Sequence, residues 1–210
     1  MTGGDQVGSD YDQADLTGQV LDGGVFTRCT FRAATMTELR TRACRFDACD
    51  FSAADLSGSV HATTAFTNCR FTMANLCTAR FEGCKLTGSD LAGARLLGLV
   101  VSGGDWTWVN LRGCDLRKRD LHGMRLLGAD LAEADLRDAD LRGADLTDAR
   151  LSNVRLAGAD LRGAVLDGTA AQTLDLRGVR LDLAQAVLVA RGLGAIVGEE
   201  WGYPEGVDDQ

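Results

Sequence analysis

The side chains with the most chemistry to offer in this chain are aspartates that recur at multiples of five residues. Fourteen Asp stand directly before a position of the series that starts at Tyr11 and advances by five to Leu181. Carboxylates at such spacing could form an anionic surface that binds a cationic partner, or they could fix backbone turns and favour solubility. The sequence favours turns and leaves the anionic surface open. The candidate partner-binding residues are Asp50, Asp55, Asp90, Asp115, Asp130 and Asp135.

Catalytic and metal-binding chemistry finds no support in the sequence. Six of the seven Cys stand two residues before the same series and are predicted to be small buried hydrophobes, while Cys77 alone points outward. No Cys-x-x-Cys or Cys/His ligand spacing occurs. His61 is expected inside beside Ser59, where a satisfied core histidine is the expectation, and His122 outside and alone. The glycine-rich segment 192–198 follows a predicted helix and not a strand, so it is no dinucleotide loop. We predict that the protein is not an enzyme and needs no cofactor.

A series of large apolar residues at every fifth position must position these aspartates. Of its 35 positions, 21 are Leu and seven are Phe, and a small residue usually stands two positions earlier. A period of five fits neither an α-helix nor a simple strand, so it indicates a repeat architecture. One large and one small side chain per pentapeptide would fill a narrow core. The frequent Gly would allow tight corners.

The stretch from Gly128 to Ala149 repeats Ala-Asp-Leu-x-x four times. In this pattern the chain resembles the pentapeptide-repeat family over roughly residues 10–182. The resemblance implies an all-β fold, a right-handed quadrilateral β-helix with four pentapeptides per coil and about eight to nine coils. Coils stacked at about 4.8 Å would give a rod of roughly 40 Å. The unbroken register predicts a smooth rod without projecting loops.

Four segments are predicted: a flexible N-terminus (1–9), the β-helix (10–181), a C-terminal helix (182–198) and a flexible acidic tail (199–210). Asp182 and Gln185 have the spacing of a capping box. The open end of a solenoid exposes core and unpaired backbone, which an apolar helix can cover. The apolar stripe is broad for a cap alone, so we expect an end-to-end homodimer. The stripe consists of Leu183, Ala186, Val187, Ala190 and Leu193.

The net charge of −8 is unevenly distributed. Residues 1–182 carry 25 acidic and 21 basic side chains, so only −4 falls on the rod. If each coil holds four pentapeptides, nine of the Asp lie on two neighbouring faces. A third face carries alternating Val and Arg up to Val100 and Asp after it. The weak charge argues against direct binding of nucleic acid. With no signal peptide and no apolar run long enough to cross a bilayer, we expect a cytoplasmic protein without membrane contact.

Several residues depart from the core pattern. Leu39 with Thr41, and Leu99 with Val101, exchange the large and small positions, which preserves volume. Arg119 stands at an inward position, where an unpaired charge is costly. Its acidic neighbour in the sequence, water, or a local bulge must accommodate it.

Two tryptophans in the segment 103–109 also depart from the pattern. Trp106 takes a large inward position, and Gly104 leaves room for it. Trp108 is expected to point outward. There it either packs over a neighbouring coil or serves as an anchor for a partner.

Within the family, the chain most resembles the loopless, dimeric group of the mycobacterial fluoroquinolone-resistance protein MfpA. The resemblance rests on the Phe-rich first half and on the segment VRLDLAQAVLVARGLG from Val179 to Gly194. It implies a dimeric rod that mimics B-form DNA in the DNA-binding saddle of DNA gyrase or topoisomerase IV. Such a rod inhibits the enzyme or protects it from quinolones or natural gyrase poisons. The alternative is a structural or interaction scaffold with an unrelated partner.

Overall fold

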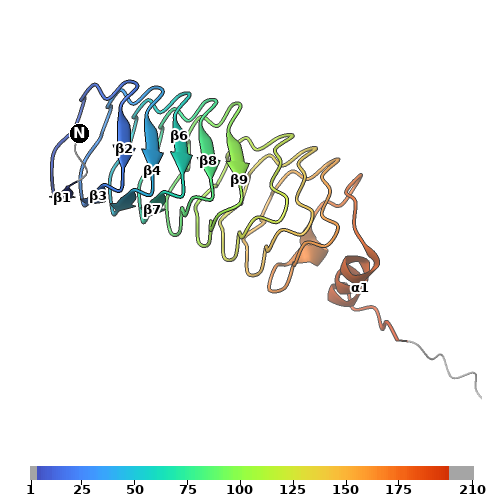
Figure 1. The fold of residues 1–210 in the computed structure, drawn as a ribbon. Coiled ribbons are helices and arrows are strands. Elements are labelled where there is room, and N and C mark those ends of the chain that lie inside the picture. Colours follow the sequence, from blue (N-terminus) through green and yellow to red (C-terminus); the bar gives the residue numbers. More distant parts are fainter. Residues whose placement is uncertain (1–3, 199–210) are drawn as a thin grey trace, which may run out of the picture.

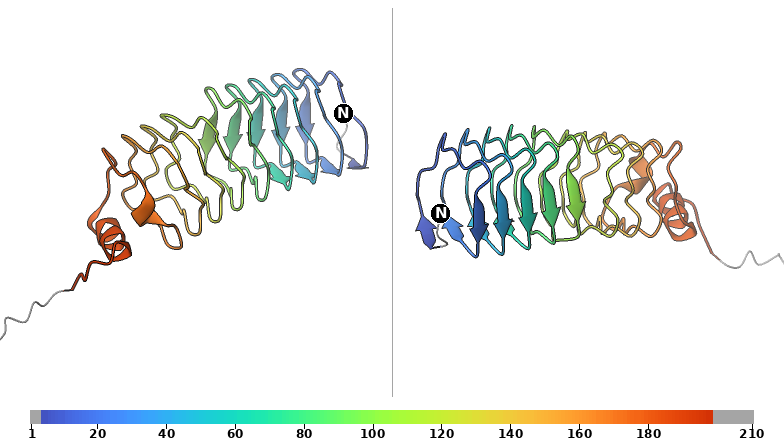
Figure 2. Two further views of the ribbon diagram at one scale, coloured as in Figure 1. Left: turned by 180° about the vertical axis from the view of Figure 1, so that it is seen from behind. Right: turned by 45° about the horizontal axis from the view of Figure 1, so that its top comes forward.

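Short parallel strands, stacked at a constant step along the sequence, build the molecule. The computed structural model describes residues 4–198, which wind into a rod whose coils lie one beside the next (Figure 1). One sheet consists of β1 (Asp5–Val7), β3 (Val25–Thr27), β5 (Arg45–Asp47) and β7 (Ala65–Thr67). The other consists of β2 (Val20–Asp22), β4 (Arg40–Arg42), β6 (Val60–Ala62), β8 (Arg80–Glu82) and β9 (Val100–Ser102). Figure 2 shows the same rod from two further directions.

Every pairing keeps the same step of one coil. Gln6 pairs with Phe26, and Phe26 pairs with Phe46. Beyond the named strands, single β-bridges continue this step as far as Asp160 and Arg180. Since the step holds four pentapeptides, each coil has four faces. The predicted β-helix with a short C-terminal helix is thereby confirmed.

The five-residue series fills the core as predicted. All seven Phe are at most 3% exposed. Phe31 stacks on Phe51, and Phe51 on Phe71, with ring centroids 4.9 Å apart in each pair. Edge-to-face contacts, such as Phe46 with Phe51 at 5.4 Å, join neighbouring columns. Each aromatic pair adds about 0.5–1.5 kcal/mol beyond its buried area, so these columns stabilise the first half of the rod.

The cysteines act as small core residues. The six inward Cys are buried, and all seven thiols are free. The Cys49 thiol donates a hydrogen bond to the Phe26 carbonyl at 3.3 Å, and the Cys114 thiol to the Leu91 carbonyl at 3.3 Å. Burial raises the pKa of the Cys114 thiol to about 12. The predicted structural role of these residues is confirmed.

His61 is a core histidine whose two ring nitrogens both have partners. Its Nε2 lies 2.9 Å from the Ser59 hydroxyl, and its Nδ1 lies 2.8 Å from the Thr41 hydroxyl. Thr64 extends this buried network, 2.9 Å from Thr41. Burial lowers the pKa of the imidazole to about 3, so the ring is neutral at pH 7. The exchange of Leu39 and Thr41 therefore preserves volume and supplies a hydroxyl to the histidine.

Helix α1 (Leu183–Gly192) closes the C-terminal end of the rod beside the short 3-10 helix η1 (Ala171–Thr173) (Figure 1). The predicted capping box is present. The Asp182 carboxylate accepts a hydrogen bond from the Gln185 N–H at 3.0 Å, and the Gln185 side-chain oxygen accepts one from the Asp182 N–H at 2.9 Å. This arrangement satisfies backbone donors at the start of the helix.

Gln185 also joins the helix to the last coils. Its side-chain amide donates hydrogen bonds to the carbonyls of Leu161 and Ala164, the latter at 2.8 Å. Leu188 and Val189 pack against the core from the same helix. The helix therefore caps the solenoid with one face and leaves its other face to solvent.

The predicted N-terminal boundary at residue 10 is wrong, because the solenoid begins one pentapeptide earlier. Strand β1 pairs with β3, and Gln6 takes the large inward position of this first unit. The Gln6 side-chain oxygen accepts hydrogen bonds from Ser9 and Tyr11, both at 3.2 Å. A polar residue in the large position hid this unit from the sequence pattern. Residues 1–3 and the predicted tail 199–210 lie outside the described residues.

The regular bridges between coils are missing at two places. One is near the C-terminal end, where positions 150 and 170, and 155 and 175, are not bridged, and the other is in the middle of the rod. Bridges join Asp90 to Asn110 and Asp105 to Arg125, but on the two faces between them the positions 95 and 115, and 100 and 120, are not bridged. We call this opening between residues 95–103 and 115–122 the seam. Figure 1 shows the rod bending after β9, at the level of the seam.

Candidate interaction surface

The six aspartates predicted to bind a partner all fix backbone corners. Each carboxylate accepts a hydrogen bond from the backbone N–H two residues later, at 2.9–3.3 Å. Asn75 and Asn110 make the same contact from equivalent positions. This contact is an Asx turn, which substitutes a side-chain acceptor for a backbone one. The turn interpretation of these aspartates is therefore confirmed, and one carboxylate oxygen remains for other contacts.

Four of these aspartates lie in columns where carboxylates alternate with other side chains. Along one face, Asp50, Asp90 and Asp130 are separated by Arg70 and Asn110. The Asn110 amide donates to Asp90 at 2.8 Å, and Asn75 makes the same contact with Asp55 at 2.9 Å. Alternation puts carboxylates roughly 10 Å apart along a column, which limits their repulsion. Asp55 and Asp90 have no Arg or Lys nitrogen within 4.0 Å in the described residues.

Arginines neutralise the other two predicted aspartates. Asp115 pairs with Arg117 at 2.6 Å, and this hydrogen-bonded pair lowers the pKa of Asp115 to about 2. Asp135 is only 4% exposed and contacts Arg117, Arg137 and Arg155 at 3.6, 2.8 and 3.0 Å. The expectation that Asp135 presents a carboxylate to a partner does not fit this burial. Three guanidinium groups converge on it because Asp135 follows Asp115 in one column and Arg155 follows next.

Negative charge changes sides halfway along the rod. We call the two faces that contain Asp50 and Asp55 the Asp50 side, and the two faces that contain Arg80 and Lys85 the Arg80 side. The outward positions counted are the residue directly before and the residue directly after each member of the five-residue series. Up to residue 102, the Asp50 side has six Asp and three Arg, and the Arg80 side four acidic and five basic residues. From residue 105, the Asp50 side has four Asp and six Arg, and the Arg80 side seven Asp and four Arg.

The residues behind this reversal are specific. The acidic residues of the Asp50 side are Asp10, Asp12, Asp15, Asp50, Asp55 and Asp90, followed by Asp115, Asp130, Asp135 and Asp175. Those of the Arg80 side are Asp5, Asp22, Asp47 and Glu82, followed by Asp105, Asp120, Asp140, Asp145, Asp160, Asp167 and Asp182. The predicted set was drawn from the Asp50 side alone. In the second half of the rod, the acidic surface lies on the opposite side.

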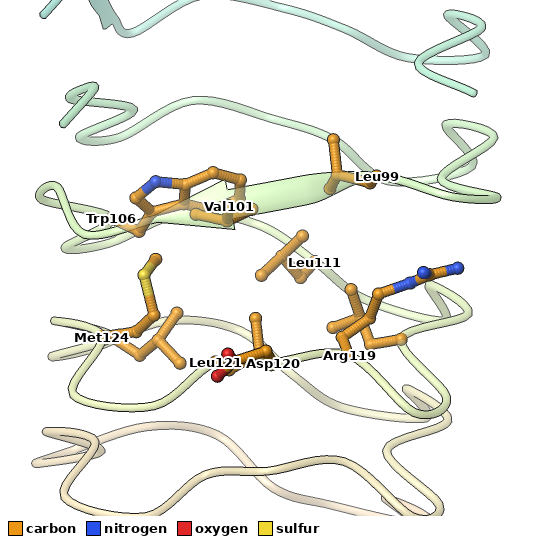
Figure 3. A pocket seen from close by; sticks show the side chains of 10 residues that line it. Leu99, Val101, Trp106, Leu111, Arg119, Asp120, Leu121 and Met124 are labelled. Atoms are coloured by element: carbon orange, nitrogen blue, oxygen red, sulfur yellow. The ribbon is translucent and has the colours of Figure 1, made fainter. Parts of the chain in front are cut away.

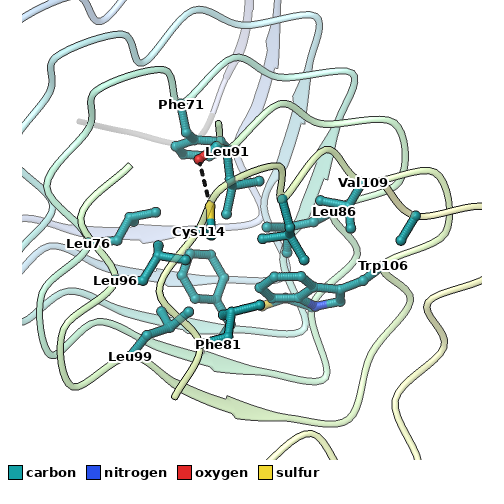
Figure 4. Close-up of a cluster of buried hydrophobic side chains, with 14 of the residues drawn as sticks. Phe71, Leu76, Phe81, Leu86, Leu91, Leu96, Leu99, Trp106, Val109 and Cys114 are labelled. Atoms are coloured by element: carbon teal, nitrogen blue, oxygen red, sulfur yellow. Dashed lines mark hydrogen bonds between the residues drawn. The ribbon is translucent and has the colours of Figure 1, made fainter. Parts of the chain in front are cut away.

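Trp108 points outward as predicted and also packs over a neighbouring coil. It is 59% exposed, and its ring lies against Gly128, where an added Cβ would be 2.4 Å from the ring. Trp106 is buried, with its ring 6.0 Å from that of Phe81 (Figure 4). Gly104 lies against the Cys84 carbonyl, which leaves no space for a side chain.

Arg119 forms no ion pair with Asp120 in the described residues. The Asp140 N–H donates to the Arg119 carbonyl at 2.9 Å, so this coil is joined to the next one, but positions 115 and 120 are not bridged to the preceding coil. The aliphatic part of Arg119 lines a cavity with Leu99 and Leu116, while the guanidinium points away from that cavity (Figure 3). Its Nε is buried and has no hydrogen-bond partner.

The residues predicted to form a dimer lie on α1 or directly after it, and three of the five are exposed. Leu183 is 81% exposed and Leu193 is 70% exposed. Ala186 is also exposed, and Val187 and Ala190 are half-buried. The helix thus presents an apolar surface at the end of the rod.

Within residues 4–198, no group of three or more His, Cys, Asp or Glu side chains is placed to hold a metal ion. None of the helices in this same part of the chain has the length and apolar character needed to span a bilayer.

The repeat identifies the family. A sequence profile described as pentapeptide repeats matches residues 44–83, 66–98, 107–148 and 144–182, more than half of the chain. The chain belongs to the pentapeptide-repeat family. A comparison with curated protein sequences finds no match for this pentapeptide-repeat protein.

Solved structures similar to this pentapeptide-repeat protein include QnrB1, described as a plasmid-mediated fluoroquinolone resistance protein. A trypsin-treated form of QnrB1 gives a TM-score of 0.80 at 23% identity, over 93% of this chain and 98% of that chain. Full-length QnrB1 gives a TM-score of 0.78 at 22% identity, over 93% and 99%. At this identity the similarity establishes the fold alone, and it points to QnrB1 rather than specifically to the MfpA group.

Proposed function

We propose that this protein binds DNA gyrase in place of duplex DNA and thereby modulates the enzyme or protects it from quinolones or natural gyrase poisons. The similarity in fold to QnrB1 supports the choice of partner. The observation that carries the proposal is the passage of the acidic surface from the Asp50 side to the Arg80 side. A partner built to hold an anionic duplex would meet carboxylates on both sides of the rod. The proposal makes the protein a cytoplasmic, non-catalytic resistance factor.

The reversal of charge has a length scale close to that of DNA. At about 4.8 Å per coil, the acidic surface stays on one side for four to five coils, roughly 20 Å of rod, before it changes to the opposite side. A strand of B-form DNA reaches the opposite side over half a helical turn, about 17 Å. The rod therefore resembles duplex DNA in where its negative charge lies. Its small net charge predicts weaker and less salt-dependent binding than that of DNA itself.

A supercoiling assay with purified gyrase, with and without ciprofloxacin, tests the proposal. Unchanged supercoiling and unchanged drug sensitivity at micromolar protein would refute the proposal. Substitution of Asp by Asn preserves the corner, because Asn75 and Asn110 already accept the same backbone hydrogen bond. We expect Asp55→Asn with Asp90→Asn to weaken the effect roughly tenfold through lost charge complementarity.

A corresponding double substitution can be made in the second half of the rod. Asp120→Asn with Asp145→Asn removes two carboxylates from the Arg80 side, and we expect a similar loss there. Asp22→Asn removes a carboxylate from the Arg80 side of the first half and serves as the control, since basic residues outnumber acidic ones in that region. A loss caused by Asp22→Asn as large as that of either double variant would contradict the proposed path of the acidic surface.

We further propose that the protein is a homodimer joined through the exposed face of α1, as the resemblance to the MfpA group implies. The exposure of Leu183 supports this proposal. Leu183→Arg should give a monomer by light scattering, because a buried unpaired charge is costly at an apolar interface. Met73→Arg, at an exposed corner of the rod wall, is the control. A Leu183→Arg protein that stays dimeric would exclude this face.

The second candidate function is a scaffold for an unrelated protein, and the exposed Trp108 favours it. A large aromatic side chain at a surface is a common anchor in protein interfaces. A pull-down that recovers a partner other than a topoisomerase, and that fails with Trp108→Ala, would favour this function over gyrase binding.

A further inference from the structure

The seam breaks a hydrogen-bond pattern that is regular in the coils around it. Residues of the five-residue series donate their N–H to a carbonyl of the next coil, as Leu91 does to Asn110 at 2.8 Å and Trp106 does to Arg125 at 3.0 Å. Leu96 and Val101 lie between these two donors, and neither has such a bond. The two coils are therefore joined on the faces that flank the seam and separated across it. Figure 3 shows the wider gap between β9 and the coil that carries Leu121.

Two large side chains in one narrow column account for the opening. Leu99 and Arg119 lie one coil apart and both occupy the small inward position, which Ala79 and Ala139 hold in the adjacent coils. The column cannot accommodate both at normal coil spacing, because protein cores are close-packed.

The first half of the rod supplies a control for this explanation. Leu39 makes the same exchange as Leu99, but the next residue of its column is the small Ser59. There the ladder is intact, and the Val60 N–H donates to the Leu39 carbonyl at 2.8 Å. A single large residue does not open the ladder, so the stacking of Arg119 on Leu99 accounts for the seam.

The interior of the seam contains a small cavity and two buried polar atoms without hydrogen-bond partners. A cavity of about 10 Å³ lies between Val101, Trp106, Leu121 and Met124, among others (Figure 3). This volume is about that of one water probe, so the cavity is too small for a ligand. The buried Nε of Arg119 and Nε1 of Trp106 lack hydrogen-bond partners, and no other buried side-chain nitrogen or oxygen in residues 4–198 does. Across the seam the two coils are held by the packing of buried side chains such as Leu99 and Leu116, without the backbone hydrogen bonds that join most other coils.

We propose that the seam is a hinge at which the two halves of the rod change their mutual angle. The bridges from Asp90 to Asn110 and from Asp105 to Arg125 form the pivot, and Arg119 keeps the opposite faces apart. Most other adjacent coils are paired on all four faces, so bending there breaks hydrogen bonds that the seam does not have. Because the acidic surface changes sides at the same level, a change of angle alters how the two acidic surfaces face a partner. The hinge does not depend on which partner that is.

Amide hydrogen exchange followed residue by residue tests the hinge in the full-length protein. Leu96 and Val101 should exchange at least about a hundredfold faster than Met36 and Thr41, their counterparts in the first half, because a backbone N–H without a partner needs no opening of the ladder. Equal protection at the two pairs would overturn the proposal without any substitution.

The variant Arg119→Ala restores a small residue to the column. It should close the seam, slow exchange at Leu96 and Val101 by about tenfold or more, and raise the melting temperature. Lys118→Ala removes a neighbouring positive charge at an exposed corner and should leave exchange unchanged. Unchanged exchange in Arg119→Ala, or equal slowing in Lys118→Ala, would contradict the role of Arg119.

A distance measurement across the seam tests the motion itself. Spin labels at Met73→Cys and Val165→Cys, in a Cys77→Ser background, lie on opposite sides of the seam and on exposed positions. The wild-type sequence at position 119 should give a broad distance distribution, and Arg119→Ala a narrower one. Equally narrow distributions in both proteins would show that the seam is rigid.

Discussion

Acidification should destabilise the protein through His61, well above the pH at which its carboxylates titrate. The imidazole is fully buried between Ser59 and Thr41, and burial lowers its pKa from 6.5 to about 3. Below pH 6.5 the unfolded chain binds a proton at this ring and the folded protein does not. The free energy of unfolding should therefore fall with a slope that approaches about 1.4 kcal/mol per pH unit, and by about 2.3 kcal/mol in all between pH 6.5 and 4.5.

The carboxylates with lowered pKa values affect stability only at a lower pH than His61 does. Hydrogen bonds from Arg117 and Arg162 lower the pKa of Asp115 and Asp160 to about 2, from an ordinary value of 3.8. Each such carboxylate stabilises the folded protein above pH 3.8, and this contribution is lost as the pH falls toward 2. The interval from pH 6.5 to 4.5 therefore reports on His61.

Urea unfolding, followed by circular dichroism at half-unit steps from pH 7 to 4.5, measures this slope. His61→Gln keeps a polar side chain but removes the titration, so its unfolding free energy should not change with pH in this interval. His122→Gln, on the surface, should behave like the wild type. A wild-type protein with constant stability from pH 6.5 to 4.5, or a His61→Gln variant that keeps the slope, would refute the reasoning.

Three further predictions concern packing, capping and the thiols. Gly104→Ala should lower the free energy of unfolding by about 3 kcal/mol or more, because the added Cβ would lie 2.1 Å from the Cys84 carbonyl oxygen. An unchanged midpoint of urea unfolding would contradict this. Gln185→Ala should cost about 1–3 kcal/mol, because it leaves the buried Ala164 carbonyl without a donor, while the Leu161 carbonyl keeps the bond from the Ala164 N–H. Calorimetry showing no loss would remove this residue from the cap. Burial raises the pKa of the Cys84 and Cys114 thiols from 9.0 to about 11 and 12. Their contribution to stability is therefore constant below pH 9 and should fall by about 1.4 kcal/mol per pH unit per thiol above it. Replacing both by Ala should make this alkaline slope smaller under reducing conditions, and an unchanged slope would contradict this.

Most of the core could be predicted from the sequence, because the rod repeats a single local rule. The five-residue series places the Phe columns, the buried Cys and His61 correctly, since each position has one allowed direction. The capping box at Asp182 and Gln185 is also local. The N-terminal unit was missed because Gln6 is polar, and its inward position depends on bonds to Ser9 and Tyr11.

The candidate surface was harder to predict, because it depends on residues a full coil apart in the sequence. From its place in the pentapeptide, Asp135 is expected to face a partner, but Arg117, Arg137 and Arg155 surround its carboxylate in the structure. The seam has the same origin, since Leu99 and Arg119 are each tolerable alone and conflict only when stacked. Reading the sequence by columns, as well as by pentapeptides, would have found both, and also the reversal of charge between residues 102 and 105.

The central claim is that the rod takes the place of duplex DNA on gyrase. Competition between the protein and a fluorescently labelled duplex for purified gyrase tests it most directly, with anisotropy as the readout. We predict that the wild-type protein displaces the duplex, and that Asp55→Asn with Asp90→Asn does so roughly ten times more weakly. Binding of the protein to gyrase with no displacement of the duplex would contradict the claim.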